Sequence, residues 1–443
     1  YLFFTFIVIS LLFTITTGKY AGGSFRIGFT LSIYAVMLVY FVVFFQSLYL
    51  KFIRKKQPNS KISVDKIFFL ISIFYCFIIF VYRFFAKLDA MEGAHYAVRL
   101  IGAISILYVV INDGSKYTKN NLMLYAGLLD VAFLIDFVIN KSFRKTNILS
   151  NVLVVGCVML ILNFICLSYL RNKTQKNYLY DSICYFHLFT MILSVALSGS
   201  RLMLIVGFVV IAYDIISIAF SKNKQLKYVL TTCLASLLMV VILYGANFGD
   251  VRYYVNKQIM TILPTAFENT DLTEPDSELD SSTMANDIKN LEKASDSKRE
   301  QLQKYGIKQF KQNVLFGNGN VLYDYKNPEN PEKGGQSASA HNFIIEFLVA
   351  FGIIGTLLFA AWFVFLFIPI IFNKKTSWWE KFDILILLFV IVSFGFVQQM
   401  LFNFIVLPIF AATIGALLTN KIDFICFKKT FKNKKIGNKQ ISK

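Results

Sequence analysis

Long apolar runs recur along almost the whole chain, and they constrain the fold more than any other sequence feature. A helix that crosses the hydrocarbon core of a bilayer needs about 20 mostly apolar residues. Runs of about this length lie near residues 1–17, 28–50, 67–87, 97–112, 122–140, 149–170, 179–197, 202–220, 228–246, 353–372, 384–403 and 405–419. Hydrophobic residues make up 56% of the 443 residues, more than a soluble core can bury. We therefore predict an all-α polytopic membrane protein with about twelve transmembrane helices, and the composition excludes a soluble enzyme.

The distribution of basic residues predicts how these helices are oriented. Lys and Arg are retained in cytoplasmic loops, and one alternating set of loops carries most of them. This set lies at residues 51–66, 116–119, 171–176, 222–227, 374–381 and 421–443. Both termini are therefore expected in the cytoplasm. The net charge of +19 follows from the same bias, so we expect no nucleic-acid partner.

One polar stretch, residues 247–340, interrupts the apolar runs and falls on the outer face by this alternation. It holds more than half of the acidic residues of the chain, and its first half is predicted to be irregular. Further on, an intermittent apolar stripe predicts a surface helix over residues 298–312. The glycines at 317 and 319 are expected to prevent the helix from continuing. We divide the chain into helices 1–9 within 1–246, an extracytoplasmic loop region at 247–340, an interfacial helix with helices 10–12 at 341–420, and a basic cytoplasmic tail at 421–443.

The apolar segment after this loop is too long for a single span. Gly352 and Gly355 interrupt it, so the sequence predicts a short interfacial helix over 341–351 and a spanning helix that starts at residue 353. Ser337 and Ser339 precede the segment and are the predicted N-caps.

Three arginines are predicted at the outer ends of apolar helices. Arg83 lies near the end of one helix, Arg99 at the start of the next, and Arg201 in the turn Ser198–Arg201 between two helices. Arginine stays charged and contacts phosphate oxygens in a bidentate manner, so an anionic headgroup at the outer leaflet is a suitable ligand. The alternative is that each arginine pairs with a nearby acid, such as Asp136, or extends to the interface.

His341 is the candidate catalytic base, because it directly follows the outer loop. A neutral imidazole accepts a proton from a hydroxyl near neutral pH. The alternative is an ordinary polar cap residue. Asn342 and Glu346 lie close by in the sequence and are candidate supporting residues.

Several chemistries are not indicated by the sequence. It has no P-loop, no HExxH motif, no nucleophile elbow and no paired aspartates of the kind that hold a metal with a sugar nucleotide. Five of the six cysteines lie in apolar segments, so we expect no disulfides. The chain begins at Tyr1 without Met, so residues are expected before it, and its first apolar run lacks the features of a cleavable signal peptide. If sugar transfer occurs outside the cytoplasm, its donor must be a lipid-linked saccharide.

Residues 340–355 resemble a family signature. They contain His341, Asn342, Glu346, Gly352 and Gly355 in the pattern His-Asn-x-x-x-Glu-x-x-x-x-x-Gly-x-x-Gly, which resembles that of the O-antigen ligase and polymerase superfamily. The turn at 198–201 resembles the small-residue turn of that family that ends in arginine. The segment from Arg299 to the Leu-Phe-Gly-Asn-Gly of residues 315–319 resembles its loop arginine, helix and Gly-x-Gly turn.

The resemblance implies a C-type glycosyltransferase of the bacterial cytoplasmic membrane that releases a lipid diphosphate from an undecaprenyl-diphosphate-linked glycan. By matched position it implies roles for Arg201, Arg299 and His341. We expect Arg201 and Arg299 to bind the diphosphate, with Arg83 or Arg99 assisting. Ser200 is a further supporting residue. No metal or other cofactor is expected, and the expected partners are the lipid-linked oligosaccharide, membrane lipids, and chain-length regulator and flippase proteins.

The shared motifs do not separate polymerases, which join repeat units, from ligases, which pass finished glycan to another acceptor. The chain is rich in Lys, Phe and Ile and poor in Arg, as AT-rich coding sequence produces, and many such bacteria lack an outer membrane. This composition favours a polymerase, with a ligase as the alternative. From a different class, a lipid-linked glycan flippase would also use outer-face arginines, and a structural or sensing membrane protein stays open.

Overall fold

The computed structural model of the chain is almost entirely helical in the parts that it describes. These are residues 37–47, 49, 64–85, 90–113, 116–141, 152–173, 177–221, 225–262, 297, 299–319, 323–325, 336–338, 340–373, 376–396 and 406–418. The predicted span at 1–17, most of the one at 28–50, Ser339 and the basic tail at 421–443 lie outside these residues.

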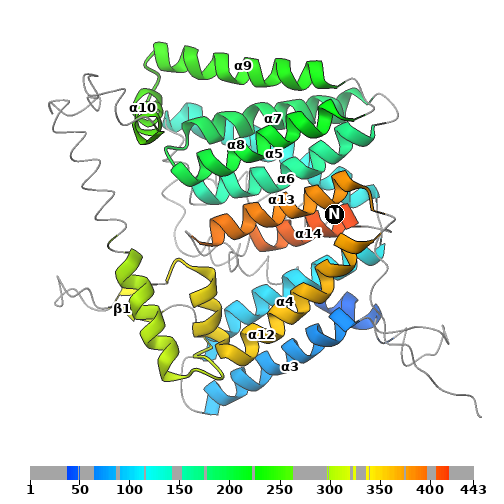
Figure 1. The fold of residues 1–443 in the computed structure, drawn as a ribbon, viewed down its shortest axis with the longest axis vertical. Helices are drawn as coiled ribbons and strands as arrows, with labels where there is room; N and C mark the ends of the chain where they lie inside the picture. Colours follow the sequence, from blue (N-terminus) through cyan, green and yellow to red (C-terminus); the bar gives the residue numbers. More distant parts are fainter. Residues whose placement is uncertain are drawn as a thin grey trace, which may run out of the picture.

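Helices account for nearly all of the described backbone, including a short helix over residues 37–47. The helices that Figure 1 labels are α3 (Val64–Phe85), α4 (Ala90–Asp113), α5 (Lys116–Asn140), α6 (Val152–Asn172), α7 (Tyr178–Leu197), α8 (Arg201–Ala219), α9 (Leu226–Gly245), α10 (Val251–Ile262), α12 (Phe343–Phe372), α13 (Trp378–Gly395) and α14 (Val406–Leu418). Among the described helices, seven are long and apolar enough to cross a membrane. The all-α polytopic membrane fold is thereby confirmed.

The long helices run side by side in a bundle (Figure 1). Helix α14 packs against both α4 and α6, and α12 packs against α3. On the other side, α7 packs against α5, α6 and α9. Helix α6 is the most buried of these spans, since side chains from Val154 to Leu167 are almost completely enclosed. Helix α9 lies at the edge of the bundle, where most of its leucines are exposed.

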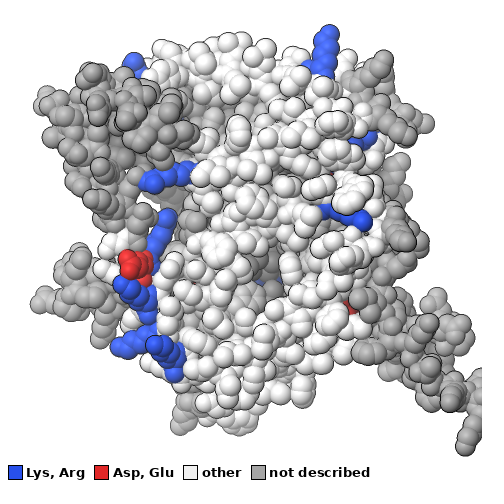
Figure 2. Space-filling model, viewed as in Figure 1, with Lys and Arg blue, Asp and Glu red and all other residues white. Residues whose placement is uncertain are grey.

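Charged side chains on the visible face gather at the two ends of the helices, while the surface between them is almost free of charge (Figure 2). An uncharged belt between two charged rims is the surface that a bilayer requires. One end holds α10, the segment 299–312 and the start of α12 (Figure 1). We refer to it as the outer end, following the orientation predicted from the loop charges.

The structure corrects several predicted boundaries. The start of the outer loop is not irregular, because α10 (Val251–Ile262) forms there. Helix α13 begins at Trp378, six residues before the predicted run, because Ser377 and Glu380 form a capping box. The predicted surface helix is present over 299–312. It is followed by an antiparallel hairpin of β1 (Tyr323–Tyr325) and β2 (Gln336–Ala338), in which Tyr323 pairs with Ala338.

Candidate functional site

Helix α12 contains a sharp break at Gly352. The backbone there has φ 63° and ψ −170°, a conformation that only glycine adopts without strain. The predicted division into a short outer helix and a spanning helix from Ile353 is therefore confirmed. Because of the break, the amides of Ile353 and Ile354 no longer reach the carbonyls of Val349 and Ala350, four residues earlier. Unpaired backbone groups at this depth would be costly, so another segment must satisfy them.

The outer loop supplies those partners through its Gly-x-Gly turn. The amides of Ile353 and Ile354 donate to Val314 O at 2.9 Å and to Leu315 O at 3.2 Å. In return, the amides of Asn318 and Gly319 donate to Val349 O at 2.6 Å and Ala350 O at 2.8 Å. Four hydrogen bonds to the loop thus replace the two bonds that the break removes from the helix.

Close backbone contact explains why glycines occupy this junction. A Cβ on Gly317, which has φ 74°, would lie 2.4 Å from the amide nitrogen of Gly352. A Cβ on Gly352 would lie 2.3 Å from Leu315 O. Both contacts are to backbone, which cannot move aside as a flexible side chain would. Gly317 and Gly352, which belong to the motifs that resemble the family, therefore have a structural role. They let the loop insert into the broken helix.

Helix α3 also contacts the junction between the loop turn and α12. The buried Tyr75 hydroxyl lies 2.6 Å from Phe351 O and 3.2 Å from Phe316 O, so it contacts both α12 and the loop turn. Arg83, two turns further along α3, is also buried. A Cβ on Gly319 would lie 2.5 Å from its Cδ, which places the arginine stem directly against the turn. Arg83 thus lies against the Gly-x-Gly turn of the loop.

Replacing Tyr75 by phenylalanine is expected to loosen this junction. The change removes the donor to a buried carbonyl, which typically costs about 1–3 kcal/mol. We expect a lower denaturation midpoint in detergent and faster proteolysis of the outer loop. Tyr82→Phe, on the exposed side of the same helix, is the matched control and is expected to leave both measurements unchanged. Equal behaviour of the two variants would show that the Tyr75 hydroxyl does not hold the junction.

His341 lies just before α12 rather than in it. Its φ is 50°, and the helix begins at Phe343. The N-cap is Asn342, whose side-chain oxygen accepts from Ile344 N at 3.1 Å and Ile345 N at 3.4 Å. Ser337 lies in β2, so the prediction of Ser337 as N-cap is wrong. The cap fixes the start of the helix, and this places the His341 backbone at a defined point of the outer end.

Glu346 lies in the first turn of α12, and its side chain is only 1% exposed. It precedes Ala350 by one helical turn, and Ala350 is bonded to Gly319, against which Arg83 lies. The broken helix, the Gly-x-Gly turn and α3 thus bring Arg83 to the half of α12 that carries Glu346 and follows His341.

Arg201 belongs to a second group at the outer end. It is the exposed first residue of α8, and Ser200 caps the helix by accepting from Met203 N at 3.4 Å. Gly199, with φ 63°, packs against Tyr254 of α10, whose ring would be 2.5 Å from an added Cβ. Ser200 therefore has a capping role, and α10, which the sequence did not predict, supports the arginine turn.

Arg299 and Arg99 occupy other positions. Arg299 is partly buried and opens the helical segment 299–312. Next to it, the Lys304 ammonium hydrogen-bonds the Glu300 carboxylate and lowers the pKa of that carboxyl. Arg99 is not at the start of its helix, because α4 begins at Ala90. It lies about 14 Å further along the axis at 1.5 Å per residue, and its guanidinium stacks 5.3 Å from the Tyr96 ring.

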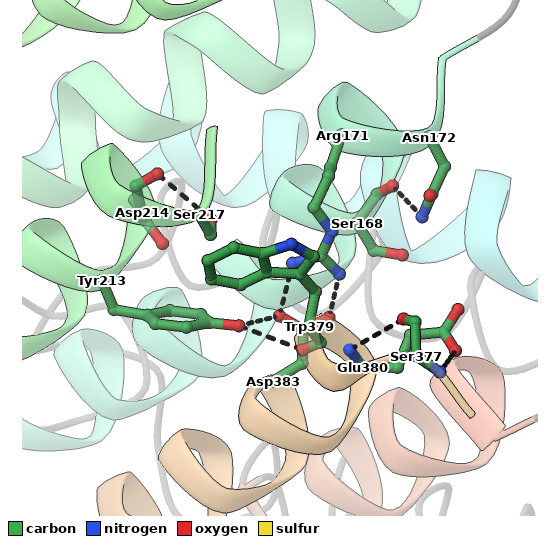
Figure 3. A network of polar contacts seen from close by, with 10 residues as sticks. All are labelled: Ser168, Arg171, Asn172, Tyr213, Asp214, Ser217, Ser377, Trp379, Glu380 and Asp383. Atoms are coloured by element: carbon green, nitrogen blue, oxygen red, sulfur yellow. Dashed lines mark hydrogen bonds and ion pairs between the residues drawn. The ribbon is translucent and has the colours of Figure 1, made fainter. Parts of the chain in front are cut away.

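A buried ion pair lies at the opposite end of the bundle, and the sequence does not predict it. The Arg171 guanidinium of α6 forms a bidentate contact with the Asp383 carboxylate of α13 (Figure 3). The Tyr213 hydroxyl of α8 lies 2.7 Å from the same carboxylate. Both charged side chains are at most 5% exposed. Asp383 directly precedes the predicted span at 384–403. An acidic residue next to an apolar run is the one sequence feature that could have indicated a buried ion pair here.

The acids that interrupt apolar runs have local partners as well. The Asp130 carboxylate lies 2.9 Å from His187 Nδ1, and Nε2 of that histidine lies 3.0 Å from Met159 O. Both ring nitrogens thus lie within hydrogen-bond distance of an oxygen acceptor. Asn163 Nδ2 donates to Asp214 at 2.7 Å. These contacts tie α5, α6, α7 and α8 together within the bundle.

Among the residues that the structure describes, no three His, Cys, Asp or Glu side chains come together as a metal site.

The fold and the outer end together define a polytopic helical membrane protein whose large outer loop is bonded into a broken span. Residues 186–360 match the family model described as O-antigen ligase. The match runs from α7 to the middle of α12 and includes Arg201, Arg299 and His341. The match confirms the resemblance of this part of the chain to the O-antigen ligase and polymerase superfamily. No curated protein and no solved structure matches the chain.

Proposed function

We propose that this chain is a polysaccharide polymerase at the outer face of the bacterial cytoplasmic membrane, with both termini in the cytoplasm. It would transfer an undecaprenyl-diphosphate-linked glycan onto a lipid-linked repeat unit. The observation that carries the proposal is the insertion of the Gly-x-Gly turn into the break of α12. This junction holds Arg83 against the turn and anchors the loop helix of Arg299 beside the helix that His341 precedes.

The proposed step is a single displacement at the anomeric carbon. The acceptor hydroxyl attacks that carbon and gives its proton to the His341 imidazole, while the bond to the diphosphate oxygen breaks. Undecaprenyl diphosphate leaves with the bonding electrons, and its growing negative charge is stabilised by fixed cationic groups. Arg201 and Arg299 are the proposed diphosphate ligands. Arg83 assists them, and the burial of its side chain strengthens its interaction with an anion.

Three structural findings affect the choice of assisting and supporting residues. Arg99 lies away from the start of its helix, so Arg83 is preferred over Arg99 for contact with the diphosphate. Asn342 and Ser200 support the site by capping α12 and α8. Glu346, which is buried one turn from the junction, is the proposed positioning residue for α12.

A polymerase and a ligase would carry out the same chemistry and would differ only in the acceptor. The Lys-rich, Arg-poor composition favours the polymerase, because it is typical of AT-rich bacteria, many of which lack lipid A. Membrane lipids, a flippase and a chain-length regulator are the proposed partners, and no metal is proposed in the step.

The test is reconstitution of the purified chain with a synthetic undecaprenyl-diphosphate-linked repeat unit as the only substrate. We expect a ladder of multiples on a gel, which Arg201→Gln weakens at low donor concentration. Ser221→Ala, at the other end of α8, is the control and is expected to retain the ladder. Transfer that requires an added lipid or protein acceptor would identify a ligase instead. Movement of the lipid between leaflets without transfer would identify a flippase and overturn the proposal.

A further inference from the structure

Three lysines share one face of the outer helical segment 299–312. Lys304, Lys308 and Lys311 follow the spacing i, i+4 and i+7, which places them on a single stripe. All three are exposed, and Ile307 beside them is also 43% exposed. The opposite face of the segment carries Leu302, which is buried. In Figure 2 this edge of the molecule shows a group of Lys and Arg side chains next to uncharged surface. We call Lys304, Lys308 and Lys311 the lysine face.

An exposed apolar turn continues from the lysine face. Val314, Leu315 and Phe316 are 37%, 56% and 49% exposed, a large amount of apolar surface for a loop outside the membrane. The backbone of this turn is bonded to Ile353 and Ile354, which are themselves 38% and 37% exposed.

The turn therefore continues the outward side of the spanning part of α12. One helical turn deeper on that span, Leu357 is 63% exposed, as expected for a side chain that faces lipid. The apolar turn thus lies where the lipid-facing surface of α12 reaches the outer end, and the lysine face lies directly beyond it.

We propose that the lysine face and the apolar turn, residues 304–316, form a docking surface for anionic phospholipid headgroups of the outer leaflet. Apolar side chains that enter the interface, with lysines at headgroup level, are the pattern of helices that lie on a membrane. The three ammonium groups complement phosphate charge, and Glu300, bonded to Lys304, is the single acid on this face within the described segment.

Lipid bound to this surface would act directly on the α12 junction, because the two share residues. Val314 and Leu315 belong to the docking surface, and their carbonyls accept the amides that the break at Gly352 releases. Lipid contact with this turn therefore stabilises the loop in the position where it completes the helix. The inference does not depend on the proposed transfer reaction, because it concerns only how the loop rests on the bilayer.

Hydrogen exchange in lipid nanodiscs tests the surface on the full chain. Nanodiscs contain phosphatidylcholine alone or a 7:3 mixture with phosphatidylglycerol. Each net positive charge near an anionic surface contributes roughly five-fold to association, so the lysine face, whose net charge with Glu300 is +2, contributes on the order of 25-fold. We expect amides of residues 299–316 to exchange on the order of 10-fold more slowly in the anionic nanodiscs. The difference is expected to shrink in 0.5 M NaCl, where charges are screened within about 4 Å.

Matched triple variants decide whether the lysine face causes this effect. Lys304→Gln/Lys308→Gln/Lys311→Gln is expected to abolish the difference between the two lipid compositions. Lys119→Gln/Lys227→Gln/Lys381→Gln removes the same charge at the opposite end and is expected to keep it. Equal exchange in both lipids, or a difference that survives in the lysine-face variant, would overturn the proposal. Protection in lipid-free detergent that rises with protein concentration would assign the surface to a second copy of the chain and overturn it too.

Discussion

Replacing His341 by alanine is expected to reduce glycan transfer by about 10² to 10⁴-fold, because the acceptor hydroxyl then loses its proton acceptor. Binding of the lipid-linked donor is expected to persist, since the proposed diphosphate ligands are arginines on α3, α8 and the loop. The measurement is single-turnover transfer in proteoliposomes, together with a separate donor-binding assay.

The backbone at His341 calls for a second variant. Its φ of 50° is unfavourable for alanine, whereas asparagine adopts this region more readily. His341→Asn therefore keeps the local conformation and removes the base. We expect the same loss of transfer in both variants, with unchanged denaturation midpoints in the asparagine variant. Wild-type transfer in His341→Asn would remove the histidine from the mechanism and leave the fold assignment intact.

Breaking the ion pair between Arg171 and Asp383 is expected to give the largest loss of stability. Asp383→Ala leaves a guanidinium buried among α6, α8 and α13 without its carboxylate, and such uncompensated charges typically cost about 3–5 kcal/mol. The denaturation midpoint in detergent should fall strongly, with a shorter half-life of the purified protein.

The double variant Arg171→Met/Asp383→Leu separates the charge from the packing. An apolar pair of similar volume often replaces a buried ion pair without loss of stability. We expect the double variant to recover most of the midpoint that Asp383→Ala loses. If Asp383→Ala has the same denaturation midpoint as the wild type, the ion pair does not hold the three helices together.

The helices and their approximate order could be predicted from the sequence, because length and apolarity alone decide what crosses a bilayer. The break in α12 was also predictable, since Gly352 interrupts an otherwise continuous apolar run. The candidate residues on either side of the loop follow from the order and spacing of the motif, and the family match spans their positions.

Contacts between distant segments could not be predicted in the same way. Nothing local to Gly317 indicates that it packs against Gly352, and nothing near Arg171 points to Asp383. Such pairs depend on how the spans assemble, and local sequence patterns do not show which spans become neighbours. The sequence does not predict helix α10, because the residues from Val251 are too polar for a span and favour an irregular loop. Arg99 was misplaced because Ala90–Tyr96, the first turns of α4, are less apolar than the rest.

The exchange of hydrogen bonds between the loop and α12 also sets the order in which the chain can be assembled. The turn at 314–319 is synthesised before Val349 and Ile353, and in the proposed orientation it must reach the outer side before they do. Until the two segments meet, α12 exposes two amides and two carbonyls that lipid cannot satisfy. If the loop lies on the outer face, as proposed, its translocation is a precondition for stable insertion of this span.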